Sequence, residues 1–173
     1  CEDKKVQMDE QLAHYNPGDL EKEFFFADYC KLPDVRPYTA ATVAAIKHSL
    51  FLSLNLPQGS ETLDDCDYLQ NQVVSHQEHL TLVHPDGQAL HDLRPLKGFD
   101  SLRVLDITGH NVPSLKFLEY TPRLEELYAR GNLISSGEGL INAKNIEVLD
   151  LSFNRISRFR SLHQLAALKN LRV

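Results

Sequence analysis

The chain has 173 residues, of which 42% are hydrophobic and 24% are charged, and its net charge is −6 at pH 7. This composition is typical of a globular protein and excludes a collagen-like or disordered chain. The negative charge argues against general nucleic-acid binding, which needs clustered Lys and Arg to neutralise phosphates. No apolar run is long enough for a membrane-spanning helix.

The N-terminal segment and the cysteines indicate an intracellular protein. The first ten residues, CEDKKVQMDE, contain no apolar secretory segment. Cys1, Cys30 and Cys66 are odd in number and widely spaced, which fits neither a disulfide framework nor a CxxC metal site. We therefore expect a reducing, cytoplasmic compartment, with no membrane contact and no cofactor or metal.

Charge divides the chain into two expected regions. Residues 1–79 carry 14 acidic and 6 basic side chains, a net of −8, whereas residues 80–173 carry 10 acidic and 12 basic, a net of +2. Such a break suggests two structural regions. We expect residues 1–79 to be helical, as a cap on the second region or as the end of an upstream helical domain.

The first predicted helix runs from Pro17 to Lys31. Asn16 is a good N-cap, and proline fits the first helical position that follows it. Pro33 and Pro37 are expected to break this helix.

A second helix is predicted from Thr39 onward. Its apolar residues recur at three-to-four spacing, with alanines on the closely packed side; they are Val43, Ile46, Leu50 and Leu54. Residues 55–62 are expected to form a loop. A third helix is predicted over residues 64–78, with Tyr68, Leu69 and Val73 on one stripe.

Residues 80–173 contain a repeat. The segment from Leu102 to Val112 reads LxxLxIxxHxV, that from Leu124 to Ile134 reads LxxLxAxxNxI, and that from Ile146 to Ile156 reads IxxLxLxxNxI. The pattern advances by 22 residues twice. LxxLxLxxNxI is the signature of leucine-rich repeats.

Less regular copies flank these three. Before them, Leu90, Leu93 and Leu96 match Val112, Leu115 and Leu118, with a poorly formed strand over Leu80 to Pro85. After Asn154 the spacing lengthens by three residues, and Leu171 starts a new copy. Terminal repeats need a polar cap over their apolar face. Since none is present, and Cys1 is not an initiator methionine, we expect a fragment with more protein, or a partner, beyond the end of the repeats.

The spacing has a physical cause. Alternate leucines point inward from short parallel strands that stack about 4.8 Å apart. The Asn side chain bonds backbone groups where the chain leaves the strand, so Asn132 and Asn154 are expected to form a ladder along the stack. His110 takes the Asn position in the first full copy and should weaken the ladder there. We therefore predict an α/β solenoid: a helical N-terminal region followed by leucine-rich repeats with a short parallel sheet in a right-handed arc.

The repeats resemble two groups of leucine-rich-repeat proteins. Over about residues 80 to 173, the pattern resembles the 22-residue class typified by regulators of type-1 protein phosphatase. It also resembles the repeat domain of plant-type Rab geranylgeranyl transferase α subunits, in which N-x-L-x-S-x-E-G-L precedes L-x-L-S-x-N-R-I-x-x-F-x-x-L. Here Asn132 to Leu140 reads NLISSGEGL, and Leu149 to Leu171 reads LDLSFNRISRFRSLHQLAALKNL. Trp is absent, so the Trp-containing helix motif of such α subunits is missing.

The second resemblance implies a role in protein prenylation. The chain would be a non-catalytic portion of an α subunit, with zinc and catalysis lying largely on the β subunit. A β subunit or a small GTPase would then be its partner. The first resemblance implies a phosphatase regulatory protein instead.

A concave strand face is the predicted binding surface. Residues that alternate with the inward leucines are displayed in three rows: His84, Asp106, Tyr128 and Asp150; then Asp86, Thr108, Arg130 and Ser152; then Val104, Glu126 and Val148. Tyr and Arg are common interface anchors, and the acidic row suits a partner that offers Lys or Arg with a hydrophobic anchor. Alternatively, Arg130 pairs with Glu126 or Asp150 on a solvated surface. Phe153 either extends the face or packs at the strand edge.

No group of residues points to catalysis. His76 and His79 are spaced as a zinc pair on a helix would be, but no third ligand is indicated and a solvated helix end is favoured. Phosphate-binding glycine motifs are absent. Arg155, Arg158 and Arg160 could bind an acidic partner, although a solubilising role is favoured. We expect a non-catalytic protein–protein interaction module that uses Asp106, Glu126, Tyr128, Arg130, Asp150 and Phe153.

Overall fold

The computed structural model describes residues 37–54, 69–84 and 87–172. The first predicted helix, the three cysteines, the loop over residues 55–62 and Asp86 lie outside these residues. Within them, no helix combines the length and the apolar character that a bilayer crossing requires.

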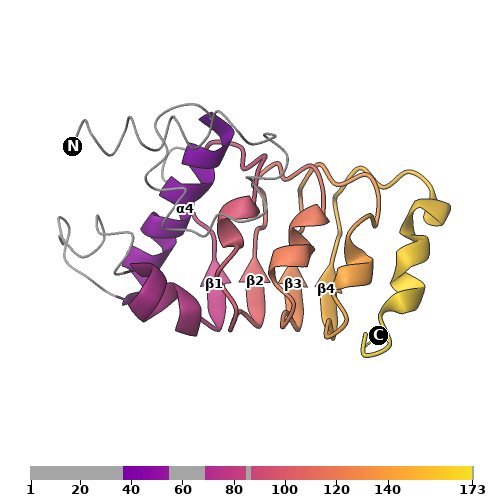
Figure 1. Cartoon of the computed structure of the whole chain (residues 1–173). Coiled ribbons are helices and arrows are strands. Elements are labelled where there is room, and N and C mark those ends of the chain that lie inside the picture. Colours follow the sequence, from indigo (N-terminus) through magenta and orange to yellow (C-terminus); the bar gives the residue numbers. More distant parts are fainter. Residues whose placement is uncertain (1–36, 55–68, 85–86, 173) are drawn as a thin grey trace, which may run out of the picture.

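Four short strands form one parallel sheet in chain order, and they lie side by side in Figure 1. They are β1 (His79–Thr81), β2 (Val104–Asp106), β3 (Glu126–Tyr128) and β4 (Val148–Asp150). Leu105 pairs with Leu127, and Leu127 pairs with Leu149. The sheet therefore has the 22-residue register that the sequence pattern predicts between β2 and β4.

Each strand is followed by a return segment that contains a short 3₁₀-helix, and these segments follow the order of the strands (Figure 1). The helices are η3 (Arg94–Leu96), η4 (Lys116–Tyr120), η5 (Leu140–Asn142) and η6 (Phe159–Ala167). Leu96, Leu118 and Leu140 from three successive segments are fully buried. The return segments thus supply the second layer of the core, opposite the leucines of the strands.

Helix α4 (Pro37–Leu54) lies beside β1 at one end of the sheet (Figure 1). It starts two residues before the predicted Thr39, because proline is tolerated in the first helical turn. Ile46 and Leu50 are fully buried as predicted, whereas Leu54 is 41% exposed and leaves the expected stripe. The buried Ser49 hydroxyl accepts a hydrogen bond of 2.8 Å from the Val83 N–H, which ties the helix to the chain beyond β1.

The described part of the third predicted helix is irregular. It consists of a five-residue π-helix, η1 (Leu69–Val73), and a 3₁₀ turn, η2 (Val74–His76). Strand β1 begins at His79, so the expected boundary between residues 79 and 80 falls inside a strand. His76 and His79 therefore belong to different elements instead of sharing a helix end, as the sequence suggested.

The first row of the predicted face needs a correction at β1. Thr81, and not His84, pairs with Asp106. The spacing from β1 to β2 is three residues longer than the repeat, because His79 pairs with Val104. His84 lies beyond the strand and is only 8% exposed. The 22-residue spacing therefore holds for the return segment before β2, where Leu96 matches Leu118, but not for strand β1.

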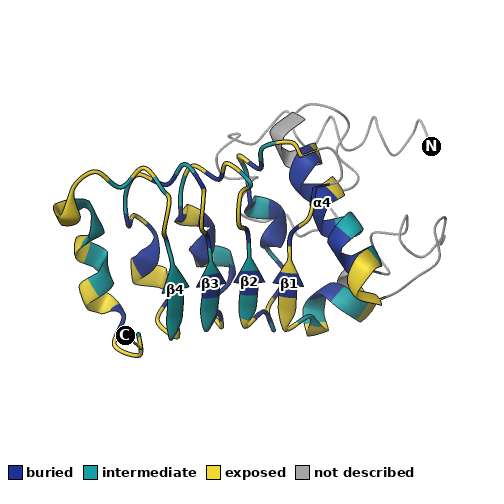
Figure 2. Ribbon diagram, turned by 180° about the vertical axis from the view of Figure 1, so that it is seen from behind, coloured by how far each residue is buried: buried dark blue, intermediate teal, exposed yellow. Residues whose placement is uncertain are grey.

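Burial decreases along the sheet. Leu105 and Leu127 are fully buried, whereas Leu149 and Leu151 are half-buried. In Figure 2 buried segments extend from α4 to the return segment before β4, and the chain after β4 is mostly intermediate or exposed. Helix η6 contains no buried residue.

Candidate protein-binding face

The side chain of Asn132 joins two successive copies of the repeat. Its amide nitrogen donates to the carbonyls of Ile107 and Ala129 at 2.9 Å each. Its oxygen accepts a hydrogen bond of 2.8 Å from the Val112 N–H. Asn132 is 3% exposed. It therefore satisfies backbone groups that water does not reach at the turn out of the strand.

Asn154 makes the same pattern one copy later. It donates to the carbonyls of Ala129 at 2.8 Å and Leu151 at 3.0 Å, and it accepts from the Ile134 N–H at 3.0 Å. Unlike Asn132, it is half-buried.

His110 occupies this position in the preceding copy. Its Nε2 lies 2.5 Å from the carbonyl oxygen of Leu82. A carbonyl can only accept, so Nε2 must carry its proton. In this copy the acceptor is the backbone carbonyl of His110 instead of an Asn side-chain oxygen. This carbonyl accepts a hydrogen bond of 2.8 Å from the Leu90 N–H. His110 thus supplies the donor of the ladder with its ring and the acceptor with its backbone.

The residues displayed by β2, β3 and β4 form the rows that the pattern predicts. Asp106 pairs with Tyr128, and Tyr128 with Asp150, in one row. Val104, Glu126 and Val148 form a second row. We call the surface made by Asp106, Glu126, Tyr128, Arg130, Asp150 and Phe153 the strand face.

The side chain of Tyr128 is oriented by a residue of its own strand, Glu126. Its hydroxyl donates a hydrogen bond of 2.7 Å to Glu126 Oε2. This bond, followed by burial and the nearby carboxylates of Glu126, Asp106 and Asp150, raises the pKa of the Tyr128 hydroxyl. The phenol therefore stays neutral at physiological pH, at the centre of three carboxylates.

Asp106 and Asp150 are oriented by the chain that follows them. Asp106 Oδ1 accepts a hydrogen bond of 2.9 Å from the Thr108 N–H, and Asp150 Oδ1 accepts one of 2.9 Å from the Ser152 N–H. The side-chain and backbone hydrogen bonds from Ser152, together with the charge of Arg130, lower the pKa of Asp150. Both carboxylates are therefore fixed in direction through one oxygen.

Arg130 packs on an aromatic ring. Its guanidinium carbon lies 4.4 Å from the centroid of the Phe153 ring, which is a cation–π contact. It forms no ion pair with any residue that the structure describes. Arg130 therefore does not reach Glu126 or Asp150 at salt-bridge distance, although its charge contributes to the lowered pKa of Asp150. Phe153 is 74% exposed, so it extends the strand face and does not pack at the strand edge.

A separate row of charges follows the residues just before the strands. Arg103 donates to Glu125 Oε1 at 2.7 Å, and Arg172 pairs with Glu147 at 2.7 Å. The Arg172 backbone N–H also donates a hydrogen bond of 2.8 Å to the Glu147 carbonyl. The Glu147 N–H donates in the same way to the Glu125 carbonyl. Arg172 follows Leu171 as Glu147 follows Ile146, so these bonds agree with the predicted start of another copy at Leu171. These ion pairs are exposed and stabilise the protein little.

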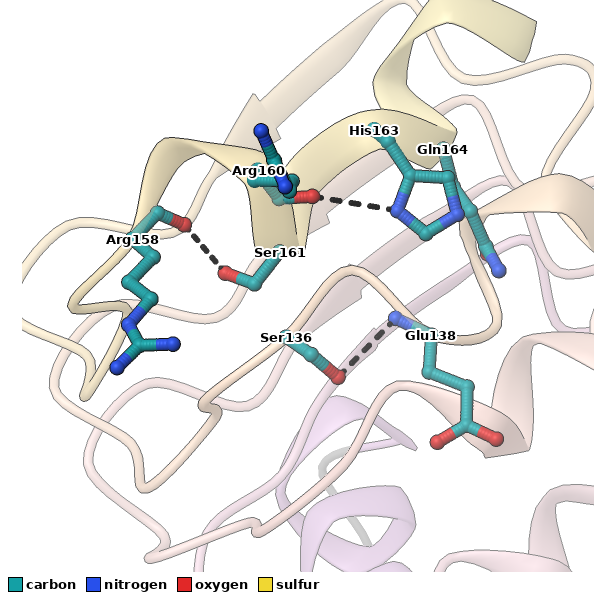
Figure 3. Close-up of a pocket in the computed structure, with 7 residues that line it drawn as sticks. All are labelled: Ser136, Glu138, Arg158, Arg160, Ser161, His163 and Gln164. Atoms are coloured by element: carbon teal, nitrogen blue, oxygen red, sulfur yellow. Dashed lines mark hydrogen bonds between the residues drawn. The ribbon is translucent and has the colours of Figure 1, made fainter.

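A hollow of about 650 Å³ lies on the return segments, away from the strands (Figure 3). Its lining residues are Ser136, Glu138, Arg158, Arg160, Ser161, His163 and Gln164. Arg158 and Arg160 extend in different directions in Figure 3, so their guanidinium groups do not converge on one ligand. Glu138 pairs with Lys116 at 3.1 Å. The solubilising role of Arg155, Arg158 and Arg160 stays a prediction.

Among the described residues, no three His, Cys, Asp or Glu side chains lie together as metal ligands. Sequence reasoning missed the contact between Arg130 and Phe153. It also missed the conformation of Phe153, whose φ is +56°. A comparison of Phe153 with Gly109 and Gly131, which precede His110 and Asn132, is the signal that could have revealed it.

Comparison with known proteins assigns no family to the chain. No family model matches the sequence. A segment of 61 residues, 34% of the chain, is 44% identical to the 187-kDa microtubule-associated protein AIR9 of Arabidopsis thaliana. The match covers 4% of that protein, so the chain spans only a small part of this relative.

Proposed function

We propose that the chain is a non-catalytic protein-binding module, a leucine-rich-repeat scaffold that binds a protein partner through its concave strand face. The observation that supports this most is the row Asp106, Tyr128 and Asp150 across three paired strands, with Arg130 and Phe153 beside it. The repeated Asn contacts in successive copies support the repeat interpretation.

The chemistry of the strand face suits a protein segment that carries Lys or Arg beside a large apolar side chain. Three carboxylates and one guanidinium give the face a net charge of −2. Asp106 and Asp150 lie two strands apart, about 10 Å given the usual strand spacing. Tyr128 stands between them and offers a flat apolar surface with a fixed hydroxyl. Aromatic and Arg side chains of this kind dominate binding energy in protein interfaces.

Two narrower functions follow from the resemblances of the sequence. They are the accessory repeat portion of a Rab geranylgeranyl transferase α subunit and a type-1 phosphatase regulator. An array of Trp-containing helical hairpins in the full-length protein would select the prenyltransferase function. Many further 22-residue copies without such an array would select the phosphatase regulator.

A comparative pull-down tests the general proposal. The immobilised wild-type chain, Tyr128→Ala/Arg130→Ala and the matched control Arg158→Ala/Arg160→Ala are incubated with cell lysate, and bound proteins are quantified by mass spectrometry. We expect specific partners to drop about tenfold or more on the face variant alone. Equal recovery of every protein by all three chains would contradict the proposal. Thermal melting of each variant checks that the fold is retained.

A further inference from the structure

Phe153 stands where the two preceding copies use glycine. Gly109, Gly131 and Phe153 each follow the end of their strand by three residues, and φ is +76°, +67° and +56° respectively. Side chains with a Cβ are disfavoured in this left-handed conformation, and bulky ones most of all. The three turns share a positive φ, and in the first two the Gly109 and Gly131 N–H groups donate at 2.9 Å to the carbonyls of Arg130 and Ser152 in the next copy.

Packing within the chain does not offset this strain. The Phe153 side chain is 74% exposed, so its ring buries little of its apolar surface. Its contact with Arg130 is a surface interaction. A residue held in an unfavourable conformation at an exposed position points to a role outside folding.

The ring is nevertheless held in place for contact with another molecule. The Arg130 guanidinium lies 4.4 Å from the ring centroid. Arg130 is itself two residues beyond Tyr128, in the row next to Asp106 and Asp150. Phe153 is thus connected through Arg130 to the part of the strand face that carries Asp106 and Asp150.

We propose that Phe153 is the apolar anchor of the strand face, and that it receives a large apolar side chain flanked by Lys or Arg in the partner segment. This inference rests on the proposed function, and it names Phe153 as the residue that binds the apolar side chain of the partner. Arg130 orients the ring, while Asp106 and Asp150 attract the flanking cations. The choice of basic flanks follows from the net negative charge of the face, to which Asp106, Glu126 and Asp150 contribute.

An anchor at a strained position has a measurable signature. Phe153→Gly should raise the midpoint of thermal unfolding, because glycine adopts positive φ freely, and it should weaken binding. Phe153→Asn is a second variant, since Asn tolerates the left-handed region. The matched control is Phe159→Ala, which removes another exposed aromatic side chain (88% exposed) from a return segment.

The probes are three seven-residue peptides of defined sequence: Gly-Ser-Lys-Leu-Lys-Ser-Gly, the same peptide with Glu for both Lys, and the same peptide with Ser for Leu. Binding is followed by NMR titration of the isotope-labelled full chain. We expect the Lys-Leu-Lys peptide to shift resonances of Tyr128, Arg130 and Phe153, and the other two peptides to do so at least several-fold more weakly. Phe153→Gly and Phe153→Asn should lower the affinity for the Lys-Leu-Lys peptide about fivefold or more. Phe159→Ala should bind this peptide as wild type does.

Two outcomes separate this inference from the proposed function. If the Lys-Leu-Lys peptide binds Phe153→Gly as it binds wild type, yet loses affinity for Asp106→Asn/Asp150→Asn, then Phe153 is not the anchor and the binding face stands. If the peptide shifts no resonance of the strand face in the wild-type chain, this inference is overturned, whereas the pull-down decides the proposed function. A lowered unfolding midpoint for both Phe153 variants would also overturn the anchor, because it would give Phe153 a structural role.

Discussion

Strands β3 and β4 carry the same sequence pattern but differ in burial. β3 lies between two strands, and its Leu127 and Ala129 are fully buried. β4 has a strand on one side, and its Leu149 and Leu151 are half-buried. On its other side, Arg172 makes a backbone hydrogen bond and an exposed ion pair with Glu147, just before β4. The pattern therefore determines which groups pair, whereas the neighbours on both sides determine how deeply the leucines are buried.

Asn132 and Asn154 show the same difference in burial between the β3 and β4 copies. Asn132 and Asn154 form the same three types of hydrogen bond at nearly equal lengths, between 2.8 and 3.0 Å. Only the exposure differs, because Asn132 is buried and Asn154 is half-buried. In a stack of repeats, stability is a sum of local and neighbour contributions. We expect the β3 copy to contribute more than the β4 copy, although their local geometry is alike.

The largest expected effect comes from the inward leucines. Leu127→Ala should lower the free energy of unfolding by about 3–5 kcal/mol, because it removes buried methyl groups and leaves a cavity between two neighbours. Leu149→Ala should cost roughly half as much, since its side chain is already partly solvated and the site can relax. Urea denaturation followed by circular dichroism measures both.

The two leucine variants share one substitution, so the chemical change is identical and only the position differs. An exposed leucine on α4, Leu52 at 52% exposure, provides a control that should change stability little. Equal losses for Leu127→Ala and Leu149→Ala would show that burial by neighbours does not distinguish the two copies.

The ladder residues should show a smaller difference in the same direction. Asn132→Ala leaves the buried Val112 N–H and Ile107 carbonyl without partners and should cost about 2–3 kcal/mol. Asn154→Ala should cost less, about 1 kcal/mol, because Asn154 is itself half-buried, so water can enter from its exposed side and replace the lost hydrogen bonds. Hydrogen exchange of the Val112 and Ile134 amides reports each loss locally. A larger loss of unfolding free energy for Asn154→Ala than for Asn132→Ala, measured by urea denaturation, would reverse the ranking.

The sequence alone was sufficient for the part of the sheet where the period is regular. Leu105, Leu127 and Leu149 pair as neighbours because 22 residues form one full turn of the pattern in this stretch. The same spacing placed Asp106, Tyr128 and Asp150 in one row. Such a row can be predicted without knowing any side-chain contact, because successive side chains along a strand point to opposite faces of the sheet.

Other features of the fold and of the strand face depend on contacts and turn conformations that the 22-residue spacing does not specify. The link between β1 and β2 is longer than one period, so Thr81 takes the place predicted for His84. The irregular turns of η1 and η2 replace the regular helix predicted there. The contact between Arg130 and Phe153 joins two copies and involves a residue at positive φ, and the period specifies neither feature. Sequence spacing specifies neighbours along the sheet but not the conformation of the turns.

The smallest predicted effect concerns the pH dependence of the β4 copy. The hydrogen bonds from Ser152 lower the pKa of Asp150 in the folded chain. A lowered folded-state pKa stabilises the protein above the unfolded-state pKa, about 3.9 for Asp, and this contribution is lost as pH falls through the folded-state pKa. Asp150→Asn should therefore cost less than about 1 kcal/mol at pH 6, and wild type and variant should converge as the pH is lowered below the unfolded-state pKa. Unfolding curves of both proteins at pH 6 and in acid measure the difference. A constant difference at both pH values would mean that Asp150 acts through packing and not through its charge.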